Sequence, residues 1–330
     1  MSASVLRASG GLVTFLARRI VLLVITISLV LAVGYVLMYY SPGSFFSSAN
    51  IAGQLGQLRV QNPALYNQYI HEFQSRYGLN QPLIAQVGKY VWNSLTFNFG
   101  NSLENPSVPI MRQLRTALPI SAILAFGSVA LSVVVGVPFG VLAALRRNTW
   151  VDSVLTTLSM VGQAIPSYVL AVLFVLLFGV WFPGLLPVNG WGTVGEAVLP
   201  VVALSAGNIA VVTRYTRGSM VEVLRQDYVR TAEAKGVRYR RVVVRHALRN
   251  SLVALVTVVG PTFAFTVVST LWVEQIFSLP GLGQLMAQAF PNKDVPLAMT
   301  SIFILCLLVM GMNLVVDLLY RVLDPRVKLE

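Results

Sequence analysis

Charged residues are scarce in this chain of 330 residues. Asp, Glu, Lys and Arg together make up 11% of it, whereas soluble globular domains carry about 25%. Hydrophobic residues make up 56%, and the mean hydropathy is +0.73. A chain of this composition does not form an ordinary water-soluble domain, and we predict an integral membrane protein.

Cysteine and histidine are nearly absent. Cys306 is the single cysteine, so no internal disulfide can form, and His71 and His246 are too far apart in the sequence to indicate a metal site. The sequence contains neither HExxH nor GxxxxGK[ST], the motifs of zinc metalloproteases and of P-loop nucleotide binding. We therefore expect neither an enzyme nor a cofactor in this chain, and any ATP that its function uses must bind to another chain.

Acidic residues are outnumbered by basic ones, 12 against 24, which gives a net charge of +12. Such an excess can indicate nucleic-acid binding. Here, however, the basic residues flank apolar runs, as the positive-inside rule for membrane proteins requires. The charge distribution therefore predicts a lipid bilayer, and no nucleic acid, as partner.

Long apolar runs are what the chain has in abundance. A helix of about 20 apolar residues crosses a hydrocarbon core of about 30 Å. The first run is longer than the apolar region of a signal peptide and no A-x-A site follows it, so we expect an uncleaved helix. Six spans are predicted, at 20–40, 117–145, 154–182 (interrupted by Pro166), 197–213, 250–273 and 295–316.

The Lys and Arg residues predict the orientation of these spans. With the N-terminus in the cytoplasm, the inner segments hold 18 of the 24, and five of the other six fall in one long loop, where charge counts little. Both termini are therefore predicted to be cytoplasmic. The expected order is a cytoplasmic segment 1–19, the helix 20–40, an extracytoplasmic segment 41–116, and a five-helix core 117–328 with a cytoplasmic loop at 214–249.

The outer segment contains one clear helix pattern. Asn62 and Pro63 are typical of an N-cap and a first helical position, and Gly78 is typical of a C-cap. These signals predict an amphipathic helix at about 63–77. We favour its packing on the outer surface or in the membrane interface over direct contact with substrate. Its apolar face comprises Leu65, Tyr69, Phe73 and Tyr77.

Ionisable residues are almost absent from the predicted spans, which gives little support to a proton-driven carrier. Gly136 and Gly140 predict close helix packing. Pro166 and Pro261 predict kinks, which either are accommodated by neighbouring helices or shape a translocation path. The positions expected to line such a path are Gln163, Pro166, Ser167, Asn208, Pro261 and Thr266.

The basic loop contains a run of good helix formers, EVLRQDYVRTAEAKG, at 222–236, and Gly236 is a typical stop. Leu224, Tyr228 and Ala232 share one face of the predicted helix. A helix of this kind can dock into a groove on a cytoplasmic partner. It can equally lie on anionic lipid, and charge alone does not separate the two.

RTAEAKG at 230–236, followed by HALRNSL at 246–252, resembles the cytoplasmic signature of permease subunits in binding-protein-dependent ABC importers. In the family this signature reads EAA, three residues, Gly, nine residues, then I-x-LP. Ala232, Gly236 and Leu248 match it. Arg230, His246 and Arg249 depart from it.

Those departures resemble the variant found in the dipeptide, oligopeptide and nickel group of these permeases. YGLNQPL (77–83) and FGNS (99–102) resemble the outer segment of its B-type subunit. FSLPGLGQL (277–285) and NLVVDLLYRVLDPRVK (313–328) resemble its C-terminal third. The resemblance runs from about residue 15 to 328.

The resemblance implies a MetI-like permease fold in a bacterial or archaeal plasma (inner) membrane. It implies three kinds of partner: a second homologous permease, one or two ATPase subunits that carry ATP and Mg, and an extracytoplasmic solute-binding protein. Relatives handle dipeptides, oligopeptides, oligosaccharides or nickel chelates, and we expect di- or oligopeptides here. The alternative is an ATP-independent channel or secondary carrier.

The resemblance also implies that the 222–236 helix sits in a cleft of an ATPase subunit and couples ATP hydrolysis to movement of the permease helices. This chain would then do no bond chemistry itself. The residues expected to carry the coupling are Asp227, Tyr228, Arg230, Thr231, Ala232, Ala234, Lys235, Gly236 and Leu248.

Overall fold

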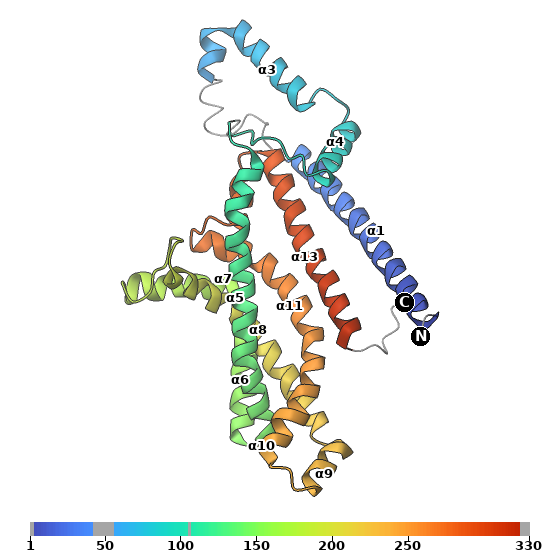
Figure 1. Ribbon diagram of the computed structural model, residues 1–330. Coiled ribbons are helices and arrows are strands. Elements are labelled where there is room, and N and C mark those ends of the chain that lie inside the picture. The colour runs from blue at the N-terminus through green and yellow to red at the C-terminus, as the bar shows by residue number, and fades with distance from the viewer. Residues whose placement is uncertain (1–2, 42–55, 105–106, 324–330) are drawn as a thin grey trace. The chain divides into compact units, whose positions relative to one another are not determined.

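The computed structural model describes residues 3–41, 56–104 and 107–323 (Figure 1). Within these ranges the regular elements are helices, apart from one isolated bridge between Asn101 and Pro109. The prediction of an all-α membrane protein is confirmed. The last block of the family resemblance, from residue 324 onward, lies outside the described residues.

The described helices follow one another along the chain in the following order. They are α1 (Ala3–Tyr40), α3 (Pro63–Tyr77), α4 (Leu83–Leu95), α5 (Ile110–Leu145), α6 (Trp150–Ala164), α7 (Ser167–Leu176), the π-helix η1 (Leu177–Trp181), α8 (Val194–Val223), α9 (Asp227–Ala234), α10 (Tyr239–Arg241), the π-helix η2 (Val242–Leu248), α11 (Arg249–Ile276), α12 (Leu282–Ala289) and α13 (Val295–Leu323).

Four helical segments in the described residues are long and apolar enough to cross a membrane: Thr14–Tyr40, Ile110–Leu145, Val194–Val223 and Val295–Leu318. The bent pair α6 and α7 makes a fifth if both arms count as one span. The fifth predicted span, 250–273, falls in α11, which is 28 residues long but is not among the helices in the described residues that pass this test. The six-span count therefore stays a prediction at α11.

The third predicted span is not one kinked helix, because α6 and α7 meet at 91° (Figure 1). Pro166 causes the break. A residue before proline is driven out of the helical region, and Ile165 is extended, with φ −91° and ψ 117°. Pro166 is then the N-cap residue of α7, a position where the helix needs no N–H from it.

The fourth span is longer than predicted, because a capping box begins α8 at Val194. The Thr193 side chain accepts a hydrogen bond from the third helical amide, and the Glu196 carboxylate accepts one from the Thr193 N–H at 2.9 Å. At the other end, α8 continues ten residues past the predicted end at 213. This extension carries Arg214 and Arg217 on the helix rather than in a loop.

The helix predicted at 63–77 is confirmed as α3, Pro63–Tyr77. The Asn62 side chain accepts a hydrogen bond from the Leu65 N–H at 3.1 Å, and Pro63 is the first helical residue. Gly78 ends the helix in the left-handed region, with φ 71°. Three side chains of the predicted apolar face, those of Tyr69, Phe73 and Tyr77, lie outside the described side chains.

The chain divides into two compact units. The first comprises Met1–Leu118 and Gln284–Leu307, and the second comprises Pro119–Gly283 and Leu308–Glu330.

Buried polar contacts hold the first unit together. The Tyr35 hydroxyl of α1 donates to Gln86 Oε1 of α4 at 2.6 Å. Lys293 Nζ donates to the main-chain carbonyls of Met38, at 3.1 Å, and Ser41, and so caps the C-terminal end of α1. The carboxylate of Asp294, which is fully buried, accepts from the Ser102 hydroxyl and from an amide in the first turn of α13. The buried charged groups among them, those of Lys293 and Asp294, thus have hydrogen-bond partners, as buried charges require.

The second unit is built on α8. Gly136 and Gly140 of α5 lie directly against it: a Cβ on Gly136 would be 2.8 Å from Val212, and one on Gly140 would be 2.6 Å from the Thr213 carbonyl oxygen. The prediction that these glycines allow close helix packing is confirmed. A separate apolar cluster joins α5, α7, α8 and α11 and contains Leu124, Ala171, Ala203, Leu204 and Val273.

Candidate functional site

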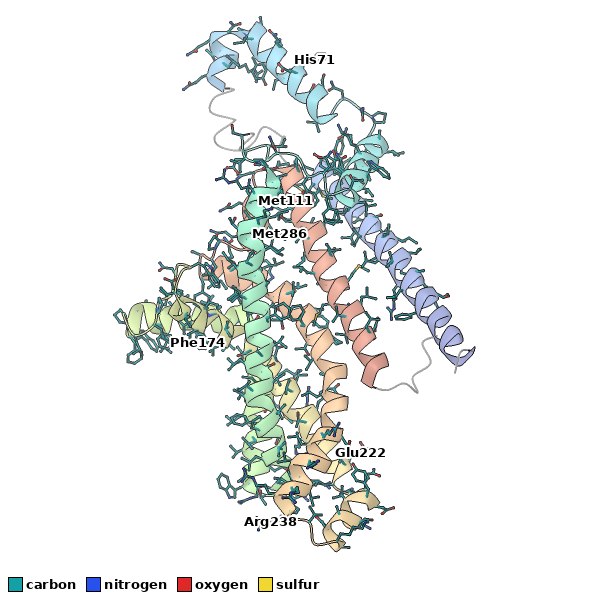
Figure 2. The ribbon with its side chains drawn as sticks, viewed as in Figure 1. His71, Met111, Phe174, Glu222, Arg238 and Met286 are labelled. Atoms are coloured by element: carbon teal, nitrogen blue, oxygen red, sulfur yellow. The ribbon has the colours of Figure 1, made fainter. Side chains whose placement is uncertain are left out.

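The basic loop does not form one helix over 222–236, as predicted, but two. The first is the end of α8, which stops at Val223, and the second is α9, Asp227–Ala234. Gln226 separates them with an extended backbone, φ −71° and ψ 147°. Figure 2 labels Glu222, at the start of this segment, and Arg238, two residues beyond Gly236. The break was invisible in the sequence, because every residue from 222 to 235 is compatible with a helix.

The end of α9 agrees with the sequence prediction. Gly236 has φ 73°, a left-handed conformation that glycine adopts at little cost. Its N–H donates to the Glu233 carbonyl at 2.9 Å, and the Val237 N–H donates to the Ala232 carbonyl at 3.2 Å. These bonds satisfy carbonyls that the helix leaves without partners, so Gly236 is a true C-terminal stop.

One side of α9 is anchored to the rest of the second unit. Val229 is 1% exposed, and α9 packs against η2. The Tyr228 hydroxyl accepts a hydrogen bond from Asn250 Nδ2 of α11 at 2.8 Å. Sequence reasoning missed Val229, although it is the only aliphatic residue of α9 larger than alanine. Through these contacts α9 is attached to η2 and to the start of α11.

The other side of α9 is open. Ala232 is half-buried, and Leu248 is half-buried in the cluster formed by Ala144, Met220 and Val243. Leu248 thus packs within the second unit and is not part of the exposed surface of α9. The remaining predicted coupling residues are exposed: Asp227, Tyr228, Arg230, Thr231, Ala234, Lys235 and Gly236. Within the described residues, then, seven of the nine are exposed, although Tyr228 also holds the hydrogen bond to Asn250 (Figure 1 shows α9 beyond the ends of α8 and α11).

The residues predicted to line a path fall in three places. Asn208 and Thr266 are brought together: Asn208 Nδ2 donates to Thr266 Oγ1 at 2.8 Å and to Ser128 Oγ at 3.3 Å. This network joins α5, α8 and α11. Because Thr266 is only 3% exposed, it packs helices together in this conformation and does not face an open path. Pro261 lies one helical turn earlier in α11.

The others lie on α6 and α7. Gln163 lines a small cavity of about 30 Å³ between α6 and α8, together with Thr156, Ser159 and Thr213. Pro166 and Ser167 form the right-angled bend described above. The structure therefore does not gather the six positions around one cavity in the described residues.

Sequence reasoning missed an ion pair between a buried carboxylate and a partly exposed guanidinium. Arg217 Nε lies 2.5 Å from Asp152 Oδ1, and Arg217 Nη2 lies 2.6 Å from Asp152 Oδ2. The Asp152 side chain is 6% exposed and that of Arg217 28%. Asp152 also accepts from the Asn148 N–H at 3.0 Å, which fixes the turn between α5 and α6. The pair went unnoticed because Arg217 was counted among the loop charges that set topology.

A second missed group is Glu274 in the FSLPGLG region. Its side chain is fully buried, and Oε2 accepts a hydrogen bond from the Gly283 N–H at 2.6 Å. A Cβ on Gly281 or Gly283 would collide with the Glu274 carboxylate. The glycines of this motif therefore allow the backbone to wrap around a buried acid. The sequence did contain a signal for this site, because an acidic residue at the end of an apolar run needs hydrogen-bond donors near it.

Comparison with known proteins identifies the family. Residues 136–329 match the family of binding-protein-dependent transport system inner membrane components. The chain is 34% identical over 318 residues to the dipeptide transport system permease protein DppB of Lactococcus lactis subsp. cremoris, covering 96% of this chain and 100% of that protein. It is 33% identical to the oligopeptide transport system permease protein OppB of Escherichia coli K12, covering 95% and 99%.

The fold is similar to that of a solved transporter. An inward-facing structure of the MetNI methionine ABC transporter matches with a TM-score of 0.55 at 19% identity, over 66% of this chain and 99% of that one. This confirms the predicted MetI-like permease fold. The chain therefore belongs to the family of inner membrane components of binding-protein-dependent transport systems, as the multi-pass permease subunit of an ABC transporter whose binding protein and ATPase are separate chains.

Proposed function

We propose that this chain pairs with a second, homologous permease to form the translocation path of an importer for di- or oligopeptides. One or two ATPase subunits drive it from the cytoplasm, and ATP and Mg bind there. A solute-binding protein delivers the peptide from outside. One six-helix subunit encloses only part of a pathway, which is why a second permease is needed.

The observation that carries the coupling role is the two-sided geometry of α9. Its exposed side presents Arg230, Thr231 and Lys235 to a partner, and its inner side is fastened through Val229 and the hydrogen bond of Tyr228. A helix that only lay on lipid would need an apolar face toward the membrane, whereas the apolar side chain of Val229 is already buried within this chain. A push on α9 is transmitted to α11 through these contacts.

The substrate class is inferred from the relatives, whose names specify dipeptides and oligopeptides. The near absence of ionisable residues from the predicted spans agrees with it, because such spans suit the passage of varied peptides without strong retention of ions.

The proposal is tested first by isolation of the assembly. The chain is purified from its native membrane in mild detergent, and the proteins recovered with it are identified by mass spectrometry. We expect a second permease and an ATPase in stoichiometric amounts. Recovery of the chain alone in several detergents would favour the ATP-independent channel or carrier.

A substitution at Gly236 tests the role of α9. Nothing in the described structure lies within 4 Å of a Cβ built there, and asparagine tolerates the left-handed backbone. Gly236→Asn therefore adds bulk to the proposed ATPase-facing surface without a clash inside this chain. We expect uptake and ATPase recovery to fall about tenfold, the effect of losing about 1.4 kcal/mol of binding.

Two controls accompany this variant. Gly218→Ala, on α8, also adds a Cβ to an open position and is expected to leave uptake unchanged. The amount of permease in the membrane must match the wild type in both variants. Normal uptake by Gly236→Asn would contradict the coupling role of α9.

A further inference from the structure

The first unit contains a polar pocket that the coupling function does not use. Its volume is about 300 Å³, and it lies between α4, the loop at 97–101 and the first turn of α13. This is the lower end of the range for ligand pockets, about 300–1,000 Å³. Lys89, Asn93 and Asn98 form its polar wall, and Tyr90, Phe99 and Pro296 form its apolar wall.

The backbone of the loop is held in an unusual conformation. Phe97 has φ 57° and Gly100 has φ 69°, and a left-handed phenylalanine is rare. The Phe97 ring packs edge-on against Phe303 of α13 at a centroid distance of 5.5 Å. The Asn98 N–H donates to the Asn93 carbonyl at 2.8 Å. The Asn98 bond closes the C-terminal end of α4, and together these contacts fix the loop that forms one side of the pocket.

Three polar side chains of the pocket are available to a ligand. Among the described residues, the Lys89 ammonium and the side-chain amides of Asn93 and Asn98 make no hydrogen bond. A single ammonium is a point charge for an anionic oxygen, and each amide can both donate and accept. A carboxylate on a peptide chain offers this combination, because its neighbouring peptide groups pair with the amides.

The predicted outer segment that supplies most of the pocket carries a net positive charge, which favours an acidic partner. The predicted outer segment 41–116 contains five basic and two acidic residues, against the usual tendency for basic residues to lie inside. One of the two acids, Glu104, already accepts a hydrogen bond from Asn292 Nδ2 at 2.9 Å. Two large aromatic side chains beside the pocket residues in sequence, Trp92 and Phe97, are 69% and 53% exposed. Exposed aromatics are typical of protein–protein contact sites.

We propose that this pocket receives an acidic side chain of the extracytoplasmic solute-binding protein and that Lys89 is its cationic anchor. The inference rests on the proposed function, which supplies that partner. Asn93 and Asn98 bind the main chain that flanks the carboxylate. The pocket thereby sets the position in which the loaded binding protein meets the first unit.

The test uses the complete transporter in nanodiscs of uncharged lipid and its purified binding protein. Affinity is measured by biolayer interferometry for the wild type, Lys89→Glu, Lys89→Arg and Arg115→Glu. Arg115 is exposed in the same predicted outer segment, outside the pocket, so its variant makes the same charge change elsewhere. We expect Lys89→Glu to weaken binding about tenfold or more, as for loss of a close interfacial charge pair, with Lys89→Arg and Arg115→Glu within about twofold of the wild type.

Each outcome of the binding measurements either supports or overturns the pocket proposal. Equal weakening by Lys89→Glu and Arg115→Glu would overturn the proposal, since only overall charge would matter. A loss that appears only in nanodiscs containing anionic lipid would also overturn it and assign the pocket to a lipid headgroup. If Lys89→Glu does not assemble, Asn98→Asp places a negative charge in the pocket at an exposed site and must weaken binding in the same way.

Failure of this proposal can be told apart from failure of the proposed function. If the wild-type transporter does not bind a solute-binding protein at all, the importer proposal fails. If the wild type binds and Lys89→Glu binds equally well, only the pocket proposal fails. ATPase activity without binding protein is expected to be the same in all variants, which shows that the cytoplasmic coupling is intact.

Discussion

The ion pair between Asp152 and Arg217 joins two helices of the second unit. Both nitrogen–oxygen distances, 2.5 and 2.6 Å, belong to a bidentate pair, which is stronger and more directional than a single contact. The pair fastens the start of α6 to α8, six residues before α8 ends. Because both helices carry apolar spans, a charge left alone there is costly.

Asp152→Asn is expected to destabilise the chain by about 3 kcal/mol, the lower end of the range for a buried pair, because Arg217 is partly exposed. The variant keeps the shape of the side chain but leaves the guanidinium without a counter-charge. The measurement is thermal unfolding of the detergent-purified assembly, followed by tryptophan fluorescence. The double variant Asp152→Asn/Arg217→Gln is expected to recover part of the loss.

Glu222→Gln is the matched control, since Glu222 is an exposed acid on the same helix as Arg217. Its melting temperature is expected to equal that of the wild type. An Asp152→Asn variant as stable as Glu222→Gln would show that the pair contributes nothing measurable.

At the scale of elements, the contact between α5 and α8 is set by glycine. Gly136 and Gly140 are one turn apart on α5 and leave no room for a side chain against α8. This arrangement brings two backbones close, which is how helices gain packing energy in a membrane. This close contact fixes how α5 and α8 are aligned along their axes at the level of the Arg217 backbone.

Gly140→Val is expected to force α5 and α8 apart, because its Cβ would lie 2.6 Å from both the Thr213 oxygen and the Thr216 Cβ. Overpacking of this kind costs about 1–3 kcal/mol. We expect a lower melting temperature and a reduced yield of assembled transporter on size-exclusion chromatography. Gly218→Ala, which meets nothing within 4 Å, is expected to be neutral or slightly stabilising. Equal behaviour of the two variants would refute the close-contact explanation.

At the scale of the whole molecule, the topology depends on whether the bent pair α6 and α7 crosses the membrane. If it crosses, α9 follows four spans and lies on the same side as the N-terminus, where an ATPase can reach it. If it re-enters, α9 follows three spans and lies on the opposite side. The coupling role of α9 therefore requires that the two arms together form one span despite the 91° bend.

Cysteine labelling tests this topology. Cys306 is the only cysteine, so Cys306→Ala gives a background without thiols. Single cysteines are then placed at exposed positions of α3 and after α9, His71→Cys (labelled His71 in Figure 2) and Lys235→Cys. With a membrane-impermeant maleimide on intact cells, we expect labelling at position 71 only. Labelling at 235 without permeabilisation would place α9 outside and contradict its role.

Local signals in the sequence determined much of this protein. Asn62, Pro63 and Gly78 defined α3 to the residue, because caps act through hydrogen bonds within three or four positions. The apolar runs predicted the spans, and the RTAEAKG and LPGLG blocks indicated the family. Gly236 ended α9 as expected, because a left-handed stop depends on that residue alone.

Tertiary structure decided which residues far apart in the sequence come together. Asp152 and Arg217 are 65 positions apart, and Asn208 and Thr266 are 58 apart, so no local pattern could pair them. After the break at Gln226, Val229 is buried and α9 packs against η2. Helix propensity does not include the free energy of this burial. Sequence determines the elements whose hydrogen bonds close within a few residues, whereas contacts between distant elements depend on how their surfaces pack.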